Sequence, residues 1–334
     1  MVNLIVNTDS RYKDKPESEN KPLNKIETKD RTLKDKKFIR SFESKIKSII
    51  NKYKLCTKKD RIIVACSGGK DSTTVLYLLK KWGYHVEGLI IDLYIGKWSK
   101  QNIVNVHKFC KEHEIKLNKI DMRDMFGCSI CFIRSGIQEK INLKNCAICG
   151  VIKRWLLNKK SRELKATKLA TGHNLDDQAE TILMNMIKGN PAKSISQTPK
   201  TGIIEDKMFV QRIKPLYFCT NDEVRRYSQL MDFPVLYQPC PCSTNATRRK
   251  IRAQIAEMEK NYPELKKNIV NYFLKEYSEK RKQMLKGTQA VESQATKSKT
   301  KEFVSEKIKY CNICGEPSRN DICQTCKLIM ILKK

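Results

Sequence analysis

The residues best suited to chemistry in this chain lie between Ser67 and Ser72, where the sequence reads Ser-Gly-Gly-Lys-Asp-Ser. Adjacent glycines let the backbone turn tightly and present its N–H groups to an anion, and the N-terminus of a following helix adds positive charge. Lys70 supplies a cation, and the two serines supply hydroxyl groups. The spacing differs from the G-x-x-x-x-G-K-S/T of Walker-type loops. The segment therefore predicts a phosphate-binding loop, with an ordinary glycine turn between strand and helix as the alternative.

Four cysteines near the C-terminus have the spacing of zinc ligands. Cys311 and Cys314 are followed, after eight residues, by Cys323 and Cys326. Two C-x-x-C pairs at this separation are typical of a four-thiolate zinc site, and Gly315 suits the tight turn that such a pair needs. A unit this small buries too little apolar surface to fold alone, so zinc would supply its folding free energy. Free or redox-active thiols are the alternative.

A further pair, Cys146 and Cys149, has no partner pair that the sequence alone identifies. Cys128 and Cys131 would complete a second four-thiolate zinc site. The alternative is a 4Fe–4S cluster, with the distant Cys240 as its third thiolate ligand. A cluster held by three cysteines would keep one iron open for exogenous sulfur. The remaining isolated cysteines lie in apolar surroundings and are expected in the core: Cys56, Cys66, Cys110 and Cys219.

The order of apolar segments places the phosphate loop in an alternating α/β domain. Residues 62–64 form a β-branched run typical of a buried parallel strand. Strands that alternate with helices form a parallel, doubly wound sheet, which binds ligands at the carboxyl ends of its strands. The expected elements are a helix through residues 38–50, strand 61–66, helix 72–82, strand 86–92, helix 103–110, strand 115–120, helix 147–164, strand 168–172 and helix 175–188.

The length and composition indicate a globular protein of the cytoplasm. The 334 residues suffice for one main domain with appendages, and 40% of them are hydrophobic. No apolar run approaches a membrane span, and residues 1–50 are charged rather than signal-like, so we expect no membrane partner. In the cytoplasm, fourteen cysteines favour thiolates and metal over disulfides.

The formal charge of +31 indicates a polyanionic partner, and nucleic acid fits best. Residues 1–37 contain ten Lys and Arg against seven Asp and Glu, so most of the excess belongs to the folded part; a general abundance of lysine is the alternative. The expected segments are a disordered basic tail at 1–35, an α/β domain at 36–218, a helical extension with the Cys240 region at 219–285, a linker at 286–307 and a terminal zinc ribbon at 308–334.

Three segments, taken together, resemble one enzyme family. They are the loop at 67–72, residues 146–164, which begin Cys-Ala-Ile-Cys-Gly, and residues 169–190, which contain Gly-His-Asn-Leu-Asp-Asp. The loop is similar to that of the N-type ATP pyrophosphatases, which split ATP into AMP and pyrophosphate. With the Cys240 region and the terminal ribbon, the segments closely resemble the tRNA 2-thiouridine synthetases of the TtuA/NcsA type. These are iron–sulfur PP-loop enzymes that use ATP to replace the C2 oxygen of a tRNA uridine with sulfur.

The resemblance covers most of the chain and implies an ATP site. Asp92 and the pair Gly172 and His173 match the nucleoside side of that site. The residues that match the ATP loop are Ala65, Ser67, Gly68, Gly69, Lys70, Asp71 and Ser72.

The resemblance also implies the cluster ligands. Cys146, Cys149 and Cys240 match them, although Cys242 could replace Cys240 as the third ligand. Lys153 matches a catalytic lysine of the family, and it lies one helical turn after Cys149, so the two share a face. The pair Cys128 and Cys131 has no counterpart in the family, and residues 1–55 lack the cysteines and histidines of the N-terminal ribbon that many members carry.

Asp177 matches the catalytic aspartate of the family, and Lys70 is the catalytic cation of the loop. Capping of a helix N-terminus is the alternative for Asp177. For Asp176 and Glu180, which flank it, capping and dipole pairing are as strongly favoured as catalysis. The candidates for tRNA phosphate contacts, with a solvated helix face as the alternative, are Arg248, Arg249, Lys250 and Arg252.

The expected function is ATP-dependent 2-thiolation of tRNA. The uridine C2 oxygen would attack the α-phosphate of magnesium-bound ATP, and sulfur from the cluster would then displace AMP. The expected partners are tRNA, a sulfur donor (sulfide, a persulfide or a thiocarboxylated carrier protein) and a second copy of the chain. Synthesis of 2-thiocytidine, a lysidine-type modification and a non-catalytic zinc protein that binds RNA are the alternatives.

Overall fold

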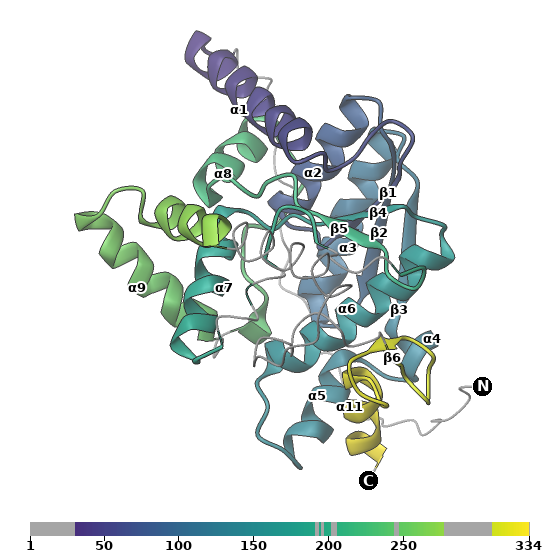
Figure 1. The fold of residues 1–334 in the computed structure, drawn as a ribbon. Coiled ribbons are helices and arrows are strands. Elements are labelled where there is room, and N and C mark those ends of the chain that lie inside the picture. Colours follow the sequence, from purple (N-terminus) through teal and green to yellow (C-terminus); the bar gives the residue numbers. More distant parts are fainter. Residues whose placement is uncertain are drawn as a thin grey trace, which may run out of the picture.

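The computed structural model describes residues 31–190, 194, 197–201, 206–243, 247–276 and 309–333. Most of the predicted tail (1–35) and all of the predicted linker (286–307) lie outside these residues. The described chain forms a five-stranded sheet with helices packed on it and a small cysteine-bearing unit beside them (Figure 1). In this part of the chain, no helix has the length and apolar content required to cross a bilayer.

The central sheet is parallel throughout, which confirms the predicted fold class. Its order is β3-β2-β1-β4-β5. The chain changes direction across the sheet at β1, which lies between β2 and β4, and the crevice outside the carboxyl end of such a strand is the usual ligand site. The strands are β1 (Arg61–Cys66), β2 (His85–Asp92), β3 (Leu117–Asp121), β4 (Lys168–Ala170) and β5 (Gln211–Ile213).

Alternate residues of β1 enter two separate cores. Ile62 and Val64 pack with helices on one face, and Ile63 packs with helices on the other. The first core contains the four isolated cysteines that were predicted to be buried there. The helices on the first face are α1 (Leu33–Lys52), α2 (Lys70–Lys81), α3 (Gly96–Glu112) and α8 (Asn221–Leu230). The helices on the second face are α5 (Ile130–Gln138) and α6 (Asn145–Glu163). The short α4 (Met122–Phe126) precedes these two in the chain.

Several helices begin at the same edge of the sheet. A helix that joins two parallel strands runs back along the sheet, so it starts near the carboxyl ends of the strands. This places the first turns of α2, α3 and α6 at that edge, together with α7 (Leu175–Ile187), which follows β4. α9 (Thr247–Asn261) packs against α7 (Figure 1). The phosphate loop, the pair Cys146 and Cys149, and the turn after β4 therefore all lie at this edge of the sheet.

The C-terminal unit docks on the second layer of helices. It consists of β6 (Lys309–Tyr310), β7 (Pro317–Ser318) and α11 (Gln324–Lys333), and α11 packs against α5 and α6. Leu332 approaches Gly136 of α5 so closely that a Cβ there would lie 2.5 Å from Leu332 Cδ1. The unit, called the ribbon below, is therefore braced against the helices that carry the internal cysteines.

A buried ion pair holds the ribbon to α6. The Glu316 carboxylate is 3% exposed, pairs with Arg162 and accepts a bond from Asn158 Nδ2 at 3.4 Å. Removing one member of a buried pair typically costs about 3–5 kcal/mol, because the other charge loses its partner. Glu316→Gln should therefore loosen the ribbon and speed its amide hydrogen exchange. Asp321→Asn breaks only the exposed pair with Lys309 and should change little; equal exchange in the two variants would contradict the prediction.

Candidate active site

The loop after β1 forms an anion cradle that requires glycine. Gly68 has a φ of +79°, in the left-handed region, and a Cβ there would lie 2.4 Å from Asn102 Oδ1. Across the loop, the Ser67 N–H donates to Ser72 Oγ at 3.1 Å. Gly69 is the N-cap of α2, and no side chain caps this helix. Its first N–H groups are therefore available to a phosphate, where the helix dipole is positive.

Lys70 and Asp71 connect the loop to the turn after β4. Lys70 is buried, and its Nζ contacts both carboxylate oxygens of Asp71 at 2.8 Å. Asn174 Nδ2 donates to Asp71 Oδ1 at 3.0 Å. A Cβ on Gly172 would lie 2.7 Å from the Ser72 nitrogen, so the turn rests directly on the start of α2. The structure thus brings together the two segments in which the sequence analysis placed the ATP site.

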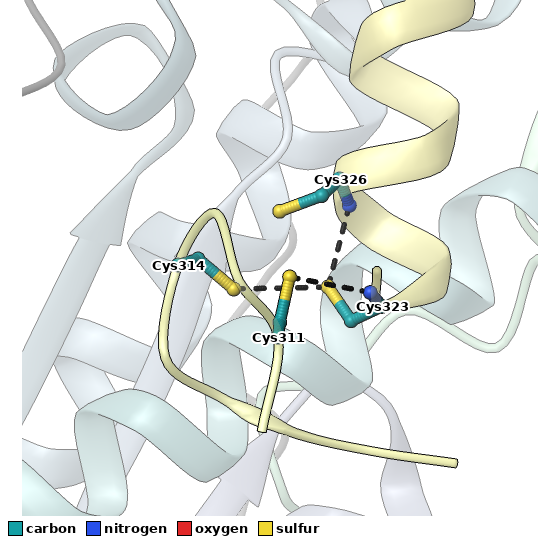
Figure 2. A group of neighbouring side chains, drawn as sticks. All are labelled: Cys311, Cys314, Cys323 and Cys326. Atoms are coloured by element: carbon teal, nitrogen blue, oxygen red, sulfur yellow. Dashed lines mark hydrogen bonds between the residues drawn. The ribbon is translucent and has the colours of Figure 1, made fainter. Parts of the chain in front are cut away.

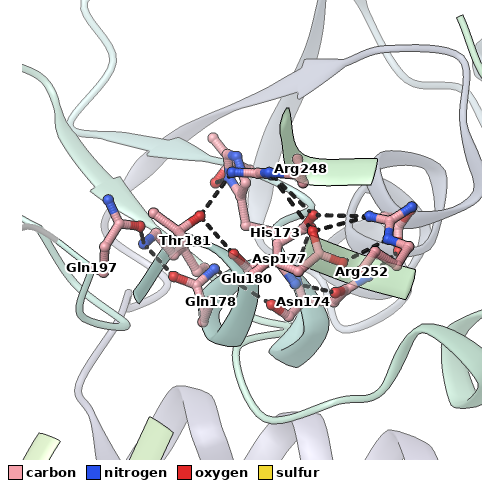
Figure 3. A network of polar contacts seen from close by, with 12 residues as sticks. His173, Asn174, Asp177, Gln178, Glu180, Thr181, Gln197, Arg248 and Arg252 are labelled. Carbon is pink, nitrogen blue, oxygen red and sulfur yellow. Dashed lines mark hydrogen bonds and ion pairs between the residues drawn. The ribbon is translucent and has the colours of Figure 1, made fainter. Parts of the chain in front are cut away.

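Asp177 caps α7 and also pairs with α9 (Figure 3). Its N–H donates to Asn174 Oδ1 at 3.1 Å, and its Oδ2 accepts from the Asn174 N–H at 3.2 Å, which is a capping box. Arg248 Nη1 lies 3.2 Å from Asp177 Oδ1, and Arg248 Nη2 donates to Thr181 Oγ1 at 2.7 Å. The capping role that the sequence allowed is present, and the ion pair with Arg248 is an addition to it.

The acidic neighbours of Asp177 have structural partners. Glu180 is 1% exposed and accepts a bond from Arg252 Nε at 2.6 Å; burial raises the pKa of Glu180, and Arg252 opposes this rise. Asp176 accepts the Asn221 N–H at 2.8 Å and pairs with Lys266 Nζ at 2.8 Å. These two carboxylates fasten α8, α9 and the following helical segment to α7, so the structure favours the structural alternative for both.

Cations that the sequence analysis did not single out lie beside His173. Lys214 is 5% exposed, and its Nζ donates to Gln178 Oε1 at 3.0 Å. Burial, followed by the charge of Arg212, lowers the pKa of Lys214 to about 7. Burial lowers the pKa of His173 to about 4; Asp177 opposes this shift and Lys214 adds to it. Lys214, Arg248 and Arg212 each lower the pKa of His173, so cations gather beside the loop, which suits a polyphosphate.

The low pKa of Lys214 should make stability depend on pH. An unfolded lysine has a pKa of about 10.4, so above pH 7 the unfolded chain binds more protons than the folded protein. The free energy of unfolding should therefore rise with pH, by about 2 kcal/mol between pH 7 and pH 9 from this residue alone. Lys214→Met should remove this part of the slope, which urea unfolding at several pH values measures. Equal slopes in the two proteins would contradict the prediction.

The remaining residues expected near the nucleoside stand at the same edge. Asp92 lies at the carboxyl end of β2 and is 8% exposed. Its Oδ2 pairs with Lys119 Nζ at 2.9 Å, and its Oδ1 accepts the Tyr94 N–H at 3.2 Å. Ala65 lies opposite Leu89 near the end of β1. Asp92 is thus in the expected place, but its carboxylate already has protein partners.

The cysteines expected to hold a cluster come from two segments that meet. Cys146 and Cys149 lie in the first turns of α6, and Cys240 immediately precedes a 3-10 turn, η2 (Pro241–Ser243), that packs against α6. Burial raises the pKa of the Cys240 thiol, while the nearby Lys153 lowers it. Each thiolate of a cubic cluster binds a different iron, so the three sulfur atoms need not touch. Three thiols at one sheet edge, with a cation beside them, fit a 4Fe–4S cluster.

α3 connects the Cys240 region to the phosphate loop. Trp98 Nε1 donates to the carbonyl of Gln238 at 3.3 Å, and the Trp98 carbonyl accepts a bond from Asn102 Nδ2 at 2.9 Å. Asn102 is the residue on which Gly68 packs. The residues of α3 that contact the two regions therefore lie one helix turn apart.

α9 provides a second connection between the same regions. Lys144 Nζ, just before α6, donates to Thr247 Oγ1 at 2.8 Å. The next residue, Arg248, pairs with Asp177 beside the phosphate loop. The start of α9 therefore contacts both the segment before Cys146 and the turn beside the phosphate loop.

The C-terminal cysteines converge (Figure 2). Gly315, with a φ of +72°, makes the turn of the first pair. Burial opposes ionisation of Cys311, but N–H groups of the ribbon backbone, led by that of Cys323, lower its pKa to about 6. Tetrahedral zinc holds its sulfur ligands at about 2.3 Å, so four thiols this close suit it. The Sγ atoms that lie within 4.8 Å of one another are those of Cys311, Cys314, Cys323 and Cys326.

The alternative zinc site at Cys128, Cys131, Cys146 and Cys149 is not assembled. Within the described part of the chain, the ribbon cysteines are the only group of metal-binding side chains that close around one point. Cys128 Sγ lies 3.5 Å from the Phe126 carbonyl. The structure therefore gives no support, among the described residues, to the alternative of a zinc ion shared by the two internal pairs.

Comparisons with known proteins agree with this arrangement. Residues 39–259 match the PP-loop domain family. A tRNA-5-methyluridine(54) 2-sulfurtransferase of Pyrococcus horikoshii is 33% identical over 298 residues, which are 88% of this chain and 86% of the relative. Cytoplasmic tRNA 2-thiolation protein 1 of Caenorhabditis elegans is 28% identical over 87% of this chain and 73% of the relative. The solved structure of the U34-tRNA thiolase NcsA from Methanococcus maripaludis, with its 4Fe–4S cluster, is similar at a TM-score of 0.64 and 29% identity, covering 73% of this chain and 80% of that one.

Proposed function

Because the chain belongs to the PP-loop family of tRNA 2-sulfurtransferases, we propose that it uses ATP to replace the C2 oxygen of a tRNA uridine with sulfur. The observation that carries the proposal is the meeting, at one sheet edge, of an uncapped phosphate loop with the thiols of Cys146, Cys149 and Cys240. Activation of the oxygen and delivery of sulfur would then take place on the same base, without its release.

The loop residues account for the activation step. ATP would lie with its phosphates on residues 67–72, with magnesium neutralising part of their charge. The uridine C2 oxygen attacks the α-phosphorus, the bond to the β-phosphate oxygen breaks, and pyrophosphate leaves. Lys70 and the N–H groups at the start of α2 stabilise the charge that develops on the leaving group. The product of this step is a uridine with AMP attached at O2. AMP is a good leaving group, so sulfur can then displace it.

Cys146, Cys149 and Cys240 would hold the cluster during sulfur transfer. When bound by three thiolates, a 4Fe–4S cluster offers one iron that no protein side chain occupies, where exogenous sulfur can be kept. Lys153 shares a helix face with Cys149 and would place a positive charge beside incoming anionic sulfur. Asp177 would act by holding Arg248 at the edge of the site, close enough to orient the base or the AMP phosphate.

The tRNA would contact the basic start of α9. A stacked uridine cannot reach such a site, so the target base must be turned out of its stack. Arg248 and Arg252 pair with α7, but Arg249 and Lys250 are exposed. The phosphate contacts are therefore assigned to Arg249 and Lys250, which also accords with the net charge of +31.

The remaining parts of the proposal concern metal, assembly and location. Zinc in the ribbon would stabilise the unit that braces α5 and α6. We further propose that the active form is a homodimer in the cytoplasm, and that the sulfur donor is sulfide, a persulfide or a thiocarboxylated carrier protein. Metal analysis and light scattering of the purified protein test the first two points.

The substrate is tested by nucleoside analysis of tRNA from a deletion strain. We expect 2-thiouridine nucleosides to disappear and to return with the wild-type gene. An unchanged profile would contradict tRNA thiolation, and a loss confined to 2-thiocytidine would instead make cytidine the substrate. Anaerobic purification, with iron counted and visible absorption recorded, tests the cluster separately; a colourless protein with full activity would contradict it.

A further inference from the structure

Cys131 and Cys242 form a thiol pair that the proposed ATP and cluster sites do not use. Cys131 lies in the first turn of α5 and Cys242 lies in η2. The Cys242 side chain lies close enough to Cys131 and to the nearby Arg134 to raise the pKa of each. Both thiols are partly exposed, so an external sulfur donor can reach them. The fold therefore joins two cysteines that are far apart in the sequence and leaves them accessible.

Arg134 is a buried cation whose polar partners are sulfur atoms. It is 8% exposed, and its Nη2 lies 3.1 Å from Cys131 Sγ, one helical turn earlier in α5. In the described chain, no carboxylate forms an ion pair with Arg134, and its buried Nε has no hydrogen-bond partner. A buried guanidinium is costly unless an anion accompanies it. Burial raises the pKa of the Cys131 thiol, and the charge of Arg134 opposes that rise. An anionic persulfide on Cys131 would supply the missing charge, and the unused Nε offers a donor to its additional sulfur atom.

The pair adjoins the cysteines proposed to hold the cluster. Cys131, Cys242 and Cys240 all pack against the apolar core that contains Cys149. Cys242 is two residues from Cys240, and Asn145, just before Cys146, donates from its Nδ2 to the Cys242 carbonyl at 3.3 Å. Sulfur released at the pair therefore emerges beside the cluster ligands.

We propose that Cys131 and Cys242 take sulfur from a persulfide donor and release it as hydrosulfide next to these ligands. The inference rests on the proposed function and names the donor class, a protein or low-molecular-weight persulfide. In the first step, the Cys131 thiolate attacks the terminal sulfur of the donor. The donor S–S bond breaks, the donor leaves as a thiolate, and Cys131 carries a persulfide whose negative charge faces Arg134.

In the second step, the Cys242 thiolate attacks Sγ of Cys131. A Cys131–Cys242 disulfide forms, the persulfide S–S bond breaks, and the terminal sulfur leaves with the bonding electron pair and a proton as hydrosulfide. The two cysteines lose two electrons, which the transferred sulfur gains. A dithiol reductant then restores both thiols and becomes a disulfide itself.

The test uses the full-length protein, purified anaerobically with its cluster and treated with glutathione persulfide. The wild type should release about one hydrosulfide per chain and acquire the Cys131–Cys242 disulfide, as read by peptide mass spectrometry after alkylation. Cys242→Ser should stop after the first step, with one extra sulfur on Cys131 and no hydrosulfide. Cys131→Ser should show neither product. Arg134→Met should slow persulfide formation on Cys131 by about tenfold.

Cys128→Ser is the matched control, because Cys128 is also partly exposed and lies three residues before Cys131. It should behave as the wild type. Hydrosulfide release by Cys131→Ser at the wild-type rate would overturn the proposal, and so would extra sulfur on Cys128 or Cys146 rather than Cys131 in Cys242→Ser. The assay contains no tRNA or ATP, so its failure leaves the proposed function standing. An unchanged tRNA profile in the deletion strain would overturn the function without altering this sulfur chemistry.

Discussion

Lys70→Ala should reduce ATP-to-AMP turnover by about 10²–10³-fold while the protein stays folded. The Lys70 ammonium is buried at the start of α2, next to the cradle of the phosphate loop. A cation fixed where charge develops on pyrophosphate stabilises the transition state without moving. The substitution also deprives the Asp71 carboxylate of its ion pair, which adds repulsion toward the phosphates. Alanine has the highest helix propensity, so α2 should persist.

Release of pyrophosphate from ATP in the presence of tRNA measures the effect. The matched control is Lys80→Ala, near the other end of the same helix, where Lys80 Nζ donates to the Glu114 carbonyl at the surface. Surface substitutions of this kind are usually close to neutral, so we expect turnover within about twofold of the wild type. Similar turnover in the two variants would mean that the loop does not hold the triphosphate.

The scaffold of the site could be predicted because its signals are local. The β-branched run 62–64, two glycines and a helical pattern lie next to one another in the sequence and adopt the expected strand, loop and helix. The errors are at the ends of elements. The strand predicted for 168–172 ends at Ala170, because Gly172 must leave the sheet to rest on the start of α2. The helix predicted from residue 72 begins at Lys70, because Gly69 caps it.

Residues that depend on contacts between distant segments could not be predicted in the same way. β5 has only three residues, too few to show a periodicity, and Arg212 and Lys214 in and after it look like surface cations in the sequence. They are drawn into the site because β5 pairs with β4 and Lys214 reaches Gln178 on α7. A signal was present: the two cations flank Ile213, which is fully buried, so the segment had to lie against the core.

The choice among the internal cysteines also needed the structure. Spacing alone allowed Cys128 and Cys131 to share a zinc ion with Cys146 and Cys149. The structure instead turns Cys131 toward Arg134 and Cys242, because η2 packs on the start of α6. Two C-x-x-C pairs of equal appearance therefore have different surroundings, which sequence spacing does not encode.

Cys149→Ala should abolish tRNA thiolation and most of the iron content, and it should leave the fold intact. Cys149 lies in α6 and is 9% exposed. Alanine has a high helix propensity and fills part of the space of the cysteine side chain, so α6 should persist. With one of three thiolates missing, a 4Fe–4S cluster loses a protein ligand and becomes accessible to solvent. Iron analysis, visible absorption and nucleoside analysis of tRNA measure the loss together.

Cys110→Ala separates loss of a ligand from loss of packing. Cys110 is 2% exposed in α3 and is also a buried helical cysteine, but burial raises the pKa of its thiol to about 11 and keeps it neutral. Both variants lose one sulfur atom from a core, so they should lose similar, small amounts of stability. We expect wild-type iron and thiolation in Cys110→Ala. If Cys149→Ala kept its iron as well, the cluster would have to rest on other thiols that pack against the same core, such as those of Cys131 and Cys242. Their pairing with Arg134 would then indicate ligation rather than sulfur relay.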